Sequence, residues 1–397
     1  MAASDLTQVA YIYKKQYSDH AVADLATRDH PLFAMISKQG GFIGKDWTYA
    51  IRYGNPQGVA GTLVAAQAGA TGSKGVQLSA LRRPKYGVIT LNGEALAAAE
   101  GNKGAFLDLV TQETDGILGE MGDAFAFDLY RSGGSRGKRL SAATNVITMT
   151  IADDARNFKV GMTVLASPNL DGSTPRAGTT TVAAVDEDAG TVTLVNAAAI
   201  TAFANADFLF RNGDPGTCME GLEALTPLIA PVNAENFRGI DRSVDSRRLS
   251  GSRINDLSSA IEENLGLAAV RVSQVGSKCD RGVLNPIRFW EVARRLNAKV
   301  EYGSAGGAVE YGFESISIST PAGTLKVLSD PDCPTNRGRI FKLSTMYLKT
   351  LKGLPHIIQD DGRVSLRATA ADDIEIRARG FVNLVQDDPS SHGVVAI

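Results

Sequence analysis

Apolar and polar side chains alternate along two stretches in the first quarter of the chain, over 47–53 and 85–91. This period of two predicts a pair of β-strands, and the first carries an aromatic face made by Trp47, Tyr49 and Tyr53. The segment between the strands consists largely of Gly, Ala and Ser. It has too few bulky apolar side chains to build a core, and it is long for a hairpin connection.

Three states of this intervening segment remain open. It is disordered, or it forms a mobile lid, or it is an extended arm that becomes ordered against a neighbouring subunit. The third state fits best with two well-formed flanking strands. Gly58, Gly61 and Lys74 in the segment, together with the aromatic face before it, are therefore candidate residues for contact between subunits.

Residues 94–132 have a period near 3.6, which predicts a long helix. Gly116, Gly119 and Gly122 recur at every third position within it. Each glycine costs about 1 kcal/mol relative to alanine in a helix. Three on one side suggest that another backbone crosses close to the helix there, and the alternative is a weak helix that breaks near Gly116.

Short runs rich in Thr and Val alternate with turns between residues 141 and 213. The sequence Asp186-Glu187-Asp188-Ala189-Gly190 in one of these turns is typical of a β-hairpin. These patterns predict a compact all-β module inserted between helical regions.

The pattern after the module is mixed. One helix is expected over 254–275, and its apolar face carries Leu257, Ile261, Leu265, Ala268 and Val272. A second helix is expected from Pro286. Strands are expected at 315–320, 325–328, 339–343, 364–368, 374–378 and 382–385.

Length and charge limit the possible functions. The chain has 397 residues, and because a single core rarely exceeds roughly 300 residues, two or more folding units are expected. The formal net charge is −2, and the basic stripe of a sequence-specific DNA-binding protein is missing. Weak, scattered contacts with DNA remain compatible with this charge. The sequence has no signal-peptide or membrane-span pattern, which favours production in a cytoplasm.

Residue types that usually carry catalysis are few and scattered. Cys218, Cys279 and Cys333 lack metal or disulfide spacing, and no two of the four histidines have metal-ligand spacing. The segment Gly133–Lys138 resembles a phosphate-binding loop, but its glycine spacing is short and Arg139 stands where Ser or Thr would bind magnesium. We interpret this segment as a basic flexible linker. We expect no enzymatic activity, no catalytic residue, no cofactor and no metal site.

Three local sequences add to the order of these parts. They are Phe237-Arg238-Gly239-Ile240-Asp241-Arg242-Ser243, Val283-Leu284-Asn285-Pro286-Ile287-Arg288-Phe289-Trp290 and Thr320-Pro321-Ala322-Gly323-Thr324-Leu325-Lys326-Val327. With an arm, a long loop, a long helix, a mixed domain and returning strands, the chain resembles the major capsid proteins of tailed bacteriophages. These proteins share the fold of the Hong Kong ninety-seven phage shell. The resemblance covers nearly the whole chain except residues 141–213.

The resemblance implies a phage major capsid fold of the α+β class with six parts. They are an N-terminal arm (1–40), an extended loop (41–93), the spine helix of a peripheral domain (94–140), an inserted β module (141–215), an axial domain (216–324), and peripheral strands with the C-terminal return (325–397). The implied function is self-assembly into the icosahedral capsid that encloses the double-stranded DNA of a tailed phage.

The resemblance also implies partners. The chain would form hexamers and pentamers of the virion capsid, assembled in the cytoplasm of a host bacterium. Because the N-terminal arm is short, a separate scaffolding protein is expected. Other expected partners are a portal protein, in some phages a decoration protein, and packaged double-stranded DNA in non-specific contact, but no membrane. Some family members cross-link loop lysines, yet no motif around Lys74 or Lys85 supports this here.

Three other functions remain open. An encapsulin-type nanocompartment has the same fold, but the inserted module and the greater length favour a phage. An enzyme with a glycine-rich lid needs a convergent acid–base or metal cluster, which the sequence does not show. The long helix and the mixed domain argue against a tail or decoration protein.

Overall fold

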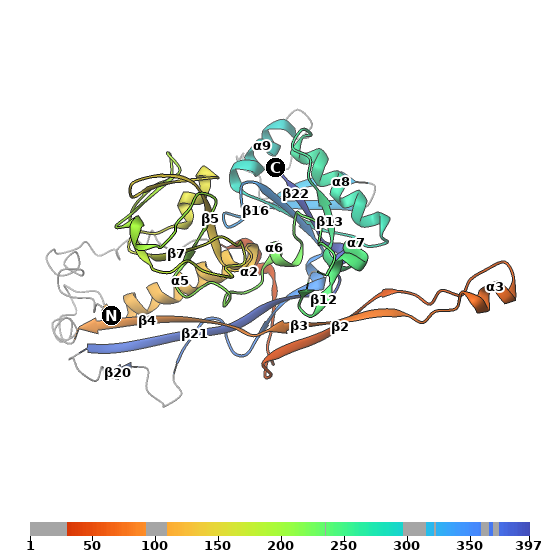
Figure 1. Cartoon of the computed structure of the whole chain (residues 1–397), viewed down its shortest axis with the longest axis horizontal. Helices are drawn as coiled ribbons and strands as arrows, with labels where there is room; N and C mark the ends of the chain where they lie inside the picture. Colours follow the sequence, from red (N-terminus) through yellow and green to blue (C-terminus); the bar gives the residue numbers. More distant parts are fainter. Residues whose placement is uncertain are drawn as a thin grey trace, which may run out of the picture.

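The computed structural model describes most of the chain. It covers residues 30–92, 109–234, 236–296, 315–320, 323–358, 365–367 and 373–397. A peripheral sheet with a long helix, a barrel and a mixed domain make up the body, and a hairpin projects from it to one side (Figure 1). No helix in the described ranges has the length and apolar character needed to cross a membrane. The predictions for residues 1–29 lie outside the described residues.

The projecting hairpin contains two antiparallel strands and a terminal helix. These are β2 (Asp46–Gly54), β3 (Lys74–Leu81) and α3 (Leu63–Ala68). The strand predicted over 47–53 is confirmed, but its partner β3 arises inside the segment that was expected to lack a strand. Val76, Leu78 and Ala80 alternate there with the polar Gln77 and Ser79, a short pattern with a period of two at the end of the glycine-rich segment. The second predicted strand, β4 (Arg83–Asn92), pairs with β21 (Asp373–Gln386) instead.

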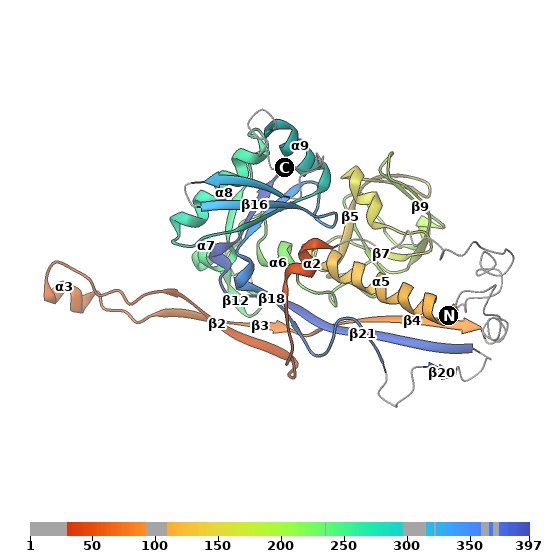
Figure 2. The ribbon, with the colours of Figure 1, turned by 180° about the vertical axis from the view of Figure 1, so that it is seen from behind.

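A six-stranded sheet and one long helix form a unit that we label the peripheral domain, after the predicted part to which the helix and most of the strands belong. The strands are β1 (Ser37–Gln39), β18 (Met346–Thr350), β21, β19 (His356–Ile357), β20 (Ser365–Arg367) and β4. Helix α5 (Leu109–Tyr130) lies along one face of this sheet (Figures 1 and 2). Phe125 and Leu129 of α5 share a core with Leu348 and Leu384 of the sheet.

The strand β21 corrects one prediction. The strands expected at 374–378 and 382–385 are a single strand, with Gly380 at their junction. A Cβ atom at Gly380 would stand 2.6 Å from Cζ of Phe125. This glycine therefore marks a close approach of α5 to the sheet rather than a break in the strand.

The described part of the predicted long helix is confirmed, and α5 does not break near Gly116. Apart from the neighbouring residues and backbone of α5 itself, no heavy atom of the described chain lies within 4 Å of the Cβ position at Gly116, Gly119 or Gly122. The predicted backbone crossing is therefore absent within the described subunit, and a crossing by another subunit stays a prediction. The sheet approaches α5 at Gly87 instead, where a Cβ would lie 2.8 Å from Cγ1 of Ile117.

The inserted module is a closed barrel. Its strands are β5 (Ser135–Ala143), β6 (Val146–Met149), β7 (Thr163–Ser167), β8 (Thr180–Asp186), β9 (Thr191–Leu194) and β10 (Phe208–Arg211), in the order β10-β5-β6-β9-β8-β7. The predicted turn at Asp186–Gly190 joins β8 to β9. Val164, Val192 and Leu209 lie in the apolar interior, so the module has its own core.

The first barrel strand corrects another interpretation. Gly133–Lys138 is not a flexible linker, because β5 begins at Ser135. Arg136 is buried, its Nη1 donates to the Asn157 carbonyl oxygen at 2.8 Å, and its guanidinium lies 4.6 Å from the ring centroid of Phe127 on α5. A residue that looks solvated in the sequence thus packs between the barrel and the long helix.

The mixed domain contains a second six-stranded sheet and two helices, and we label it the axial domain because it holds most of the residues predicted for that part. The strand order is β13 (Ser252–Ile254), β22 (Gly393–Ala396), β17 (Arg337–Phe341), β14 (Arg281–Leu284), β16 (Gly323–Ser329) and β15 (Ser315–Thr320). Helices α8 (Ile261–Gln274) and α9 (Pro286–Leu296) share one core with it. Residues 325–397 were predicted as peripheral strands with the C-terminal return, but β16, β17 and β22 of this range lie in the axial sheet.

The helix predicted over 254–275 begins later than expected. Residue 254 ends β13, and α8 starts at Ile261. Leu257, which was expected on the apolar face, lies in the connection and is exposed. The other predicted apolar positions of this helix are buried: Ile261, Leu265, Ala268 and Val272.

Candidate functional site

The root of the hairpin packs against the body through its aromatic face. One cluster joins Tyr49, Ile51, Tyr53 and Val76 to Leu78, Ile240 and Leu249, and a second joins Trp47 and Tyr49 to Ala80, Tyr347 and Val385. The Nζ atom of Lys349 lies 4.0 Å from the ring centroid of Trp47. The predicted aromatic residues thus hold the hairpin on its own subunit.

Arg238 fixes this root to the rest of the molecule. Its Nη1 donates to Tyr49 Oη at 3.0 Å, its Nη2 to the Leu384 carbonyl oxygen at 2.8 Å, and its Nε pairs with Glu220 at 2.6 Å. The amide of Ser79 on β3 donates to the Arg238 carbonyl oxygen at 3.1 Å. Burial alone would raise the pKa of Glu220, but the guanidinium of Arg238 lowers it.

A tight turn presents Arg238 to the hairpin. It joins β11 (Asn236–Phe237) to β12 (Ile240–Asp241). Arg238 has a φ of 52° and Gly239 a φ of 89°, so both lie in the left-handed region that glycine tolerates best. The glycine-centred sequence noted above is thus the anchor of the hairpin.

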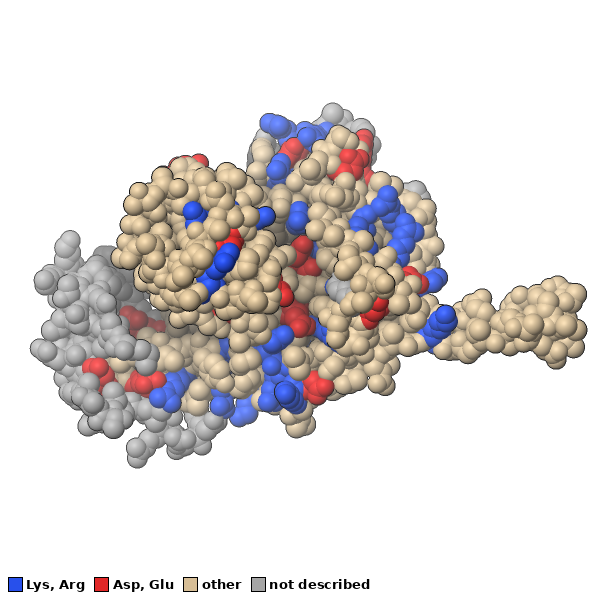
Figure 3. Space-filling model, viewed as in Figure 1, with Lys and Arg blue, Asp and Glu red and all other residues tan. Residues whose placement is uncertain are grey.

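Beyond the root, the hairpin continues into a tip without charge. Residues 54–73 contain no Asp, Glu, Lys, Arg or His. Val59, Leu63 and Val64 are 99%, 73% and 77% exposed. Figure 3 shows this uncharged end projecting beyond the last Lys or Arg of the hairpin. The tip therefore offers apolar side chains that the described part of the subunit leaves uncovered.

The tip is ordered by its own hydrogen bonds. The Gln57 amide donates to the Thr71 carbonyl oxygen at 3.2 Å, and the Thr71 amide donates back at 2.6 Å. Thr62 caps α3, since its Oγ1 accepts from the Ala65 amide at 3.3 Å. A backbone that is already ordered loses little conformational entropy on docking, which suits a binding surface.

The hairpin brings together part of the predicted set. Gly58 and Gly61 lie in the tip, and the exposed Lys74 begins β3 at its base. A Cβ at Gly58 would lie 3.4 Å from the Cα of Ala70, and one at Gly61 would meet nothing within 4 Å. The three glycines predicted on the long helix belong to α5 in the body and are not part of this surface.

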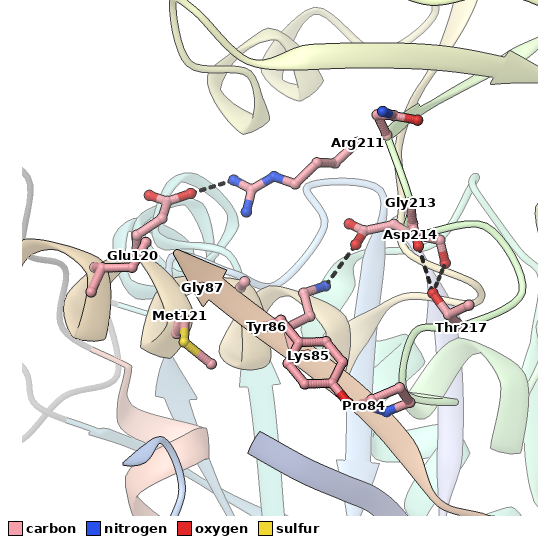
Figure 4. Close-up of a pocket in the computed structure, with 13 residues that line it drawn as sticks. Pro84, Lys85, Tyr86, Gly87, Glu120, Met121, Arg211, Gly213, Asp214 and Thr217 are labelled. Carbon is pink, nitrogen blue, oxygen red and sulfur yellow. Dashed lines mark hydrogen bonds and ion pairs between the residues drawn. The ribbon is translucent and has the colours of Figure 1, made fainter. Parts of the chain in front are cut away.

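A buried charged cluster lies where β4, α5 and the segment after the barrel meet (Figure 4). Lys85 Nζ donates to Asp128 Oδ2 at 2.7 Å, to Asp214 Oδ1 at 3.1 Å and to Cys218 Sγ at 3.3 Å. Burial alone would lower the pKa of Lys85, but the negative charge of Asp128 and its other neighbours raises it. Lys85 therefore stays charged and buried, away from the projecting loop.

The same cluster has the donor set of a small metal site. Ligand atoms of Asp128, Asp214 and Cys218 lie within 4.8 Å of one another. The ammonium group of Lys85 contacts all three residues and already supplies the positive charge that a metal would bring. We interpret the cluster as an internal salt bridge.

Sequence reasoning missed this cluster because its members are far apart. Lys85 is 43, 129 and 133 positions from its three partners. The cluster borders a pocket of about 400 Å³, on the wall of which Arg211 pairs with Glu120 (Figure 4). One signal in the sequence is that Lys85 shares a strand face with Gly87 and Leu91, which point to the core.

A second network, the His30 junction, joins three parts of the body. His30 Nε2 lies 2.9 Å from Asp123 Oδ1, and His30 Nδ1 lies 2.6 Å from Asp332 Oδ2. Lys159 of the barrel lies 2.9 Å from Asp123 Oδ2 and also pairs with Glu120. Burial alone would lower the pKa of His30, but the two aspartates raise it to about 9.

Comparison with known proteins identifies the fold. No protein-family model matches the sequence, and no curated protein matches it. A capsid subunit of cyanophage A-1(L) is similar in structure over 99% of this chain and 98% of that chain, with a TM-score of 0.56 and 12% sequence identity. The chain has the capsid fold of the Hong Kong ninety-seven type. The α+β capsid fold predicted from the sequence is thereby confirmed.

Two other solved structures align over nearly the full length of the chain. A Mycobacterium phage Ogopogo chain is 12% identical, with 98% of each chain covered and a TM-score of 0.48. A chain of the holo-SrpI encapsulin complex from Synechococcus elongatus is 7% identical, with 100% of this chain and 96% of that chain covered and a TM-score of 0.49.

Proposed function

We propose that this chain is the structural subunit of an icosahedral capsid that encloses the double-stranded DNA of a tailed phage. The observation that carries the proposal is the ordered, charge-free tip of the hairpin, held out from the body by a firmly anchored root. The capsid fold supports the same function. A structural role without enzymatic activity follows from this proposal.

The exposed side chains of the tip favour contact with another copy of the chain. Fully burying a Val or Leu side chain contributes about 1.5–3 kcal/mol. Helix α3, which carries Leu63 and Val64, stands at one end of an elongated molecule, far from the bulk of its own body (Figures 1 and 2). Val59 precedes this helix in the exposed tip. When one surface of a subunit docks on a different surface of its neighbour, the contact repeats and closes a ring if the rotation allows.

The proposed partners follow from this assembly. The chain forms hexamers and pentamers of the virion capsid in the cytoplasm of a host bacterium. A separate scaffolding protein and a portal protein take part in assembly, a decoration protein binds in some phages, and packaged DNA contacts the inner surface without sequence specificity.

Substitution of the tip tests the proposal. In the triple variant V59D, L63D and V64D, three charges would have to be buried at each contact, so we expect folded subunits that form no shells. The measurement is negative-stain electron microscopy, with circular dichroism to confirm folding. The control V195D places one charge at an exposed position on the barrel and should leave shells intact.

Two results would contradict the proposal. Normal shells from the triple variant would remove the tip from assembly, and a wild-type chain that remains monomeric or dimeric would remove the capsid function. The nucleic acid content of particles purified from infected cells separates the phage capsid from a nanocompartment, since only the capsid should hold a double-stranded DNA genome.

A further inference from the structure

Helix α9 of the axial domain exposes an unusual set of side chains. Ile287 and Trp290 are 60% and 61% exposed, and Arg294 one turn further along is also exposed. The three residues follow one another at spacings of three and four, so they form a single stripe on the helix. Large aromatic and Arg side chains of this kind dominate the energetics of protein–protein contacts.

Helix α8 exposes a stripe of opposite charge. Glu263 is exposed, Leu267 is 44% exposed, and Val270 is half-buried at the next position of the same side. Leu267 lies four residues after Glu263, and Trp290 lies four residues before Arg294. Within each stripe, the charged residue and the large apolar residue are therefore about 6 Å apart along the helix axis. The charged residue comes first along the chain in α8 and second in α9.

We propose that the α9 stripe of one subunit docks in antiparallel orientation on the α8 stripe of a neighbouring copy. In this register Arg294 meets Glu263, Trp290 covers Leu267, and Ile287 lies over Val270. The inference rests on the proposed capsid function and names a second subunit contact, separate from the hairpin tip.

The two helices already make a similar contact within one subunit. Arg295 of α9 lies 3.8 Å from Glu262 of α8, so the end of one helix lies beside the start of the other. Glu263 and Arg294 are the adjacent positions on each helix and point to solvent. A neighbour docked through them would continue the same alternation of α8 and α9 from copy to copy.

A second copy of this chain is the occupant that both stripes fit. A contact between two different surfaces of identical subunits generates rings, and the stripes are different, complementary and located on one domain. Both helices lie at the end of the axial domain that is remote from β21 (Figures 1 and 2). Axial domains can therefore meet through these helices while the hairpins contact other neighbours.

A pair of engineered cysteines tests the register. We expect L267C combined with W290C to give disulfide-linked ladders up to the ring size when assembled shells are oxidised and run on non-reducing gels. The control pair Q274C and W290C places the α8 thiol about 10 Å further along the helix and should give at most traces of cross-link. The three native cysteines are buried and should stay unreacted.

The outcomes separate the two proposals. In one outcome the wild-type chain forms shells while the variant with L267C and W290C gives only monomers, or no more cross-link than the control pair. That result would overturn this contact and leave the capsid function standing. A wild-type chain that forms no shells would overturn the capsid function and this inference with it.

Discussion

Lys85 shows how much single side chains hold together in this subunit. Its ammonium group joins the peripheral sheet to Asp128 on α5 and to Asp214 after the barrel. Lys85 was considered for cross-linking because it borders the loop in the sequence, but alternation along β4 turns it into the interior. Local pattern predicts a strand there, and only the packed fold reveals which charges meet.

Replacing Lys85 with Met tests this role. The change leaves two buried carboxylates without their cation, so the free energy of unfolding should fall by about 3–5 kcal/mol. The measurement is denaturant unfolding of subunits that carry the tip variant and therefore stay unassembled. K74M alters an exposed lysine and should change the stability by no more than about 0.5 kcal/mol. Equal effects from K85M and K74M would contradict the assignment.

His30 gives the subunit a pH-dependent connection. Its pKa in the fold is about 9, above the ordinary 6.5, so the stability it contributes is fully present below pH 6.5 and is lost as the pH rises through 9. The pKa of Asp123 is lowered, so its contribution is present above about pH 3.8 and is lost on acidification below that value. The His30 junction is thus strongest between about pH 4 and 6.5.

The loss of stability that His30 should cause above pH 6.5 can be tested. Thermal unfolding of the unassembled subunit should show a loss of stability between pH 6.5 and 9 in the wild type. H30Q keeps a hydrogen-bonding side chain but cannot carry the charge, so its stability should change less over this range. Parallel curves for H30Q and the wild type would show that His30 does not titrate there.

Among the elements, periodic segments were predicted well and their partners were not. The aromatic strand, the long helix and the barrel hairpin have clear periods in the sequence, and all three are confirmed. The pairing of β4 with β21 and the place of β16 in the axial sheet depend on contacts between segments that are distant in the sequence, and β2 pairs with β3 rather than with the other predicted strand. No local pattern specifies such contacts, because both partners have the same period of two.

The glycines of α5 and its sheet also show that local sequence does not specify which elements approach each other. The three glycines of α5 were expected to mark a crossing, yet the close approaches of α5 to its sheet lie at Gly87 and Gly380. A glycine in a helix and a glycine in a strand look alike in sequence. Which of them meets another backbone or ring depends on how the helix rests on the sheet.

Two alanine substitutions separate these cases. G380A should destabilise the unassembled subunit by about 1–3 kcal/mol, because the added methyl group would overlap the ring of Phe125. G119A adds the same group in open space within a helix and should stabilise the subunit by up to about 1 kcal/mol. Denaturant midpoints measure both, and a stabilising G380A would contradict the described packing. If a neighbouring backbone crosses α5, G119A should still weaken shell assembly.

The whole molecule combines a body with several cores and a projecting arm that has none of its own. The sequence favours an extended arm, ordered by a neighbouring subunit, for the glycine-rich segment between the two predicted strands, and the exposed apolar side chains of that segment lie in the uncharged tip between β2 and β3. The root is occupied by its own subunit through Trp47 and Tyr49. Assembly is therefore expected to depend on the tip more than on the aromatic face.

Electron cryomicroscopy of assembled particles tests this account most directly. The account predicts closed shells in which the tip of each hairpin, with Val59, Leu63 and Val64, lies buried against the body of a neighbouring copy. Shells in which the tips project freely into solvent, or a chain that forms no shells, would contradict it.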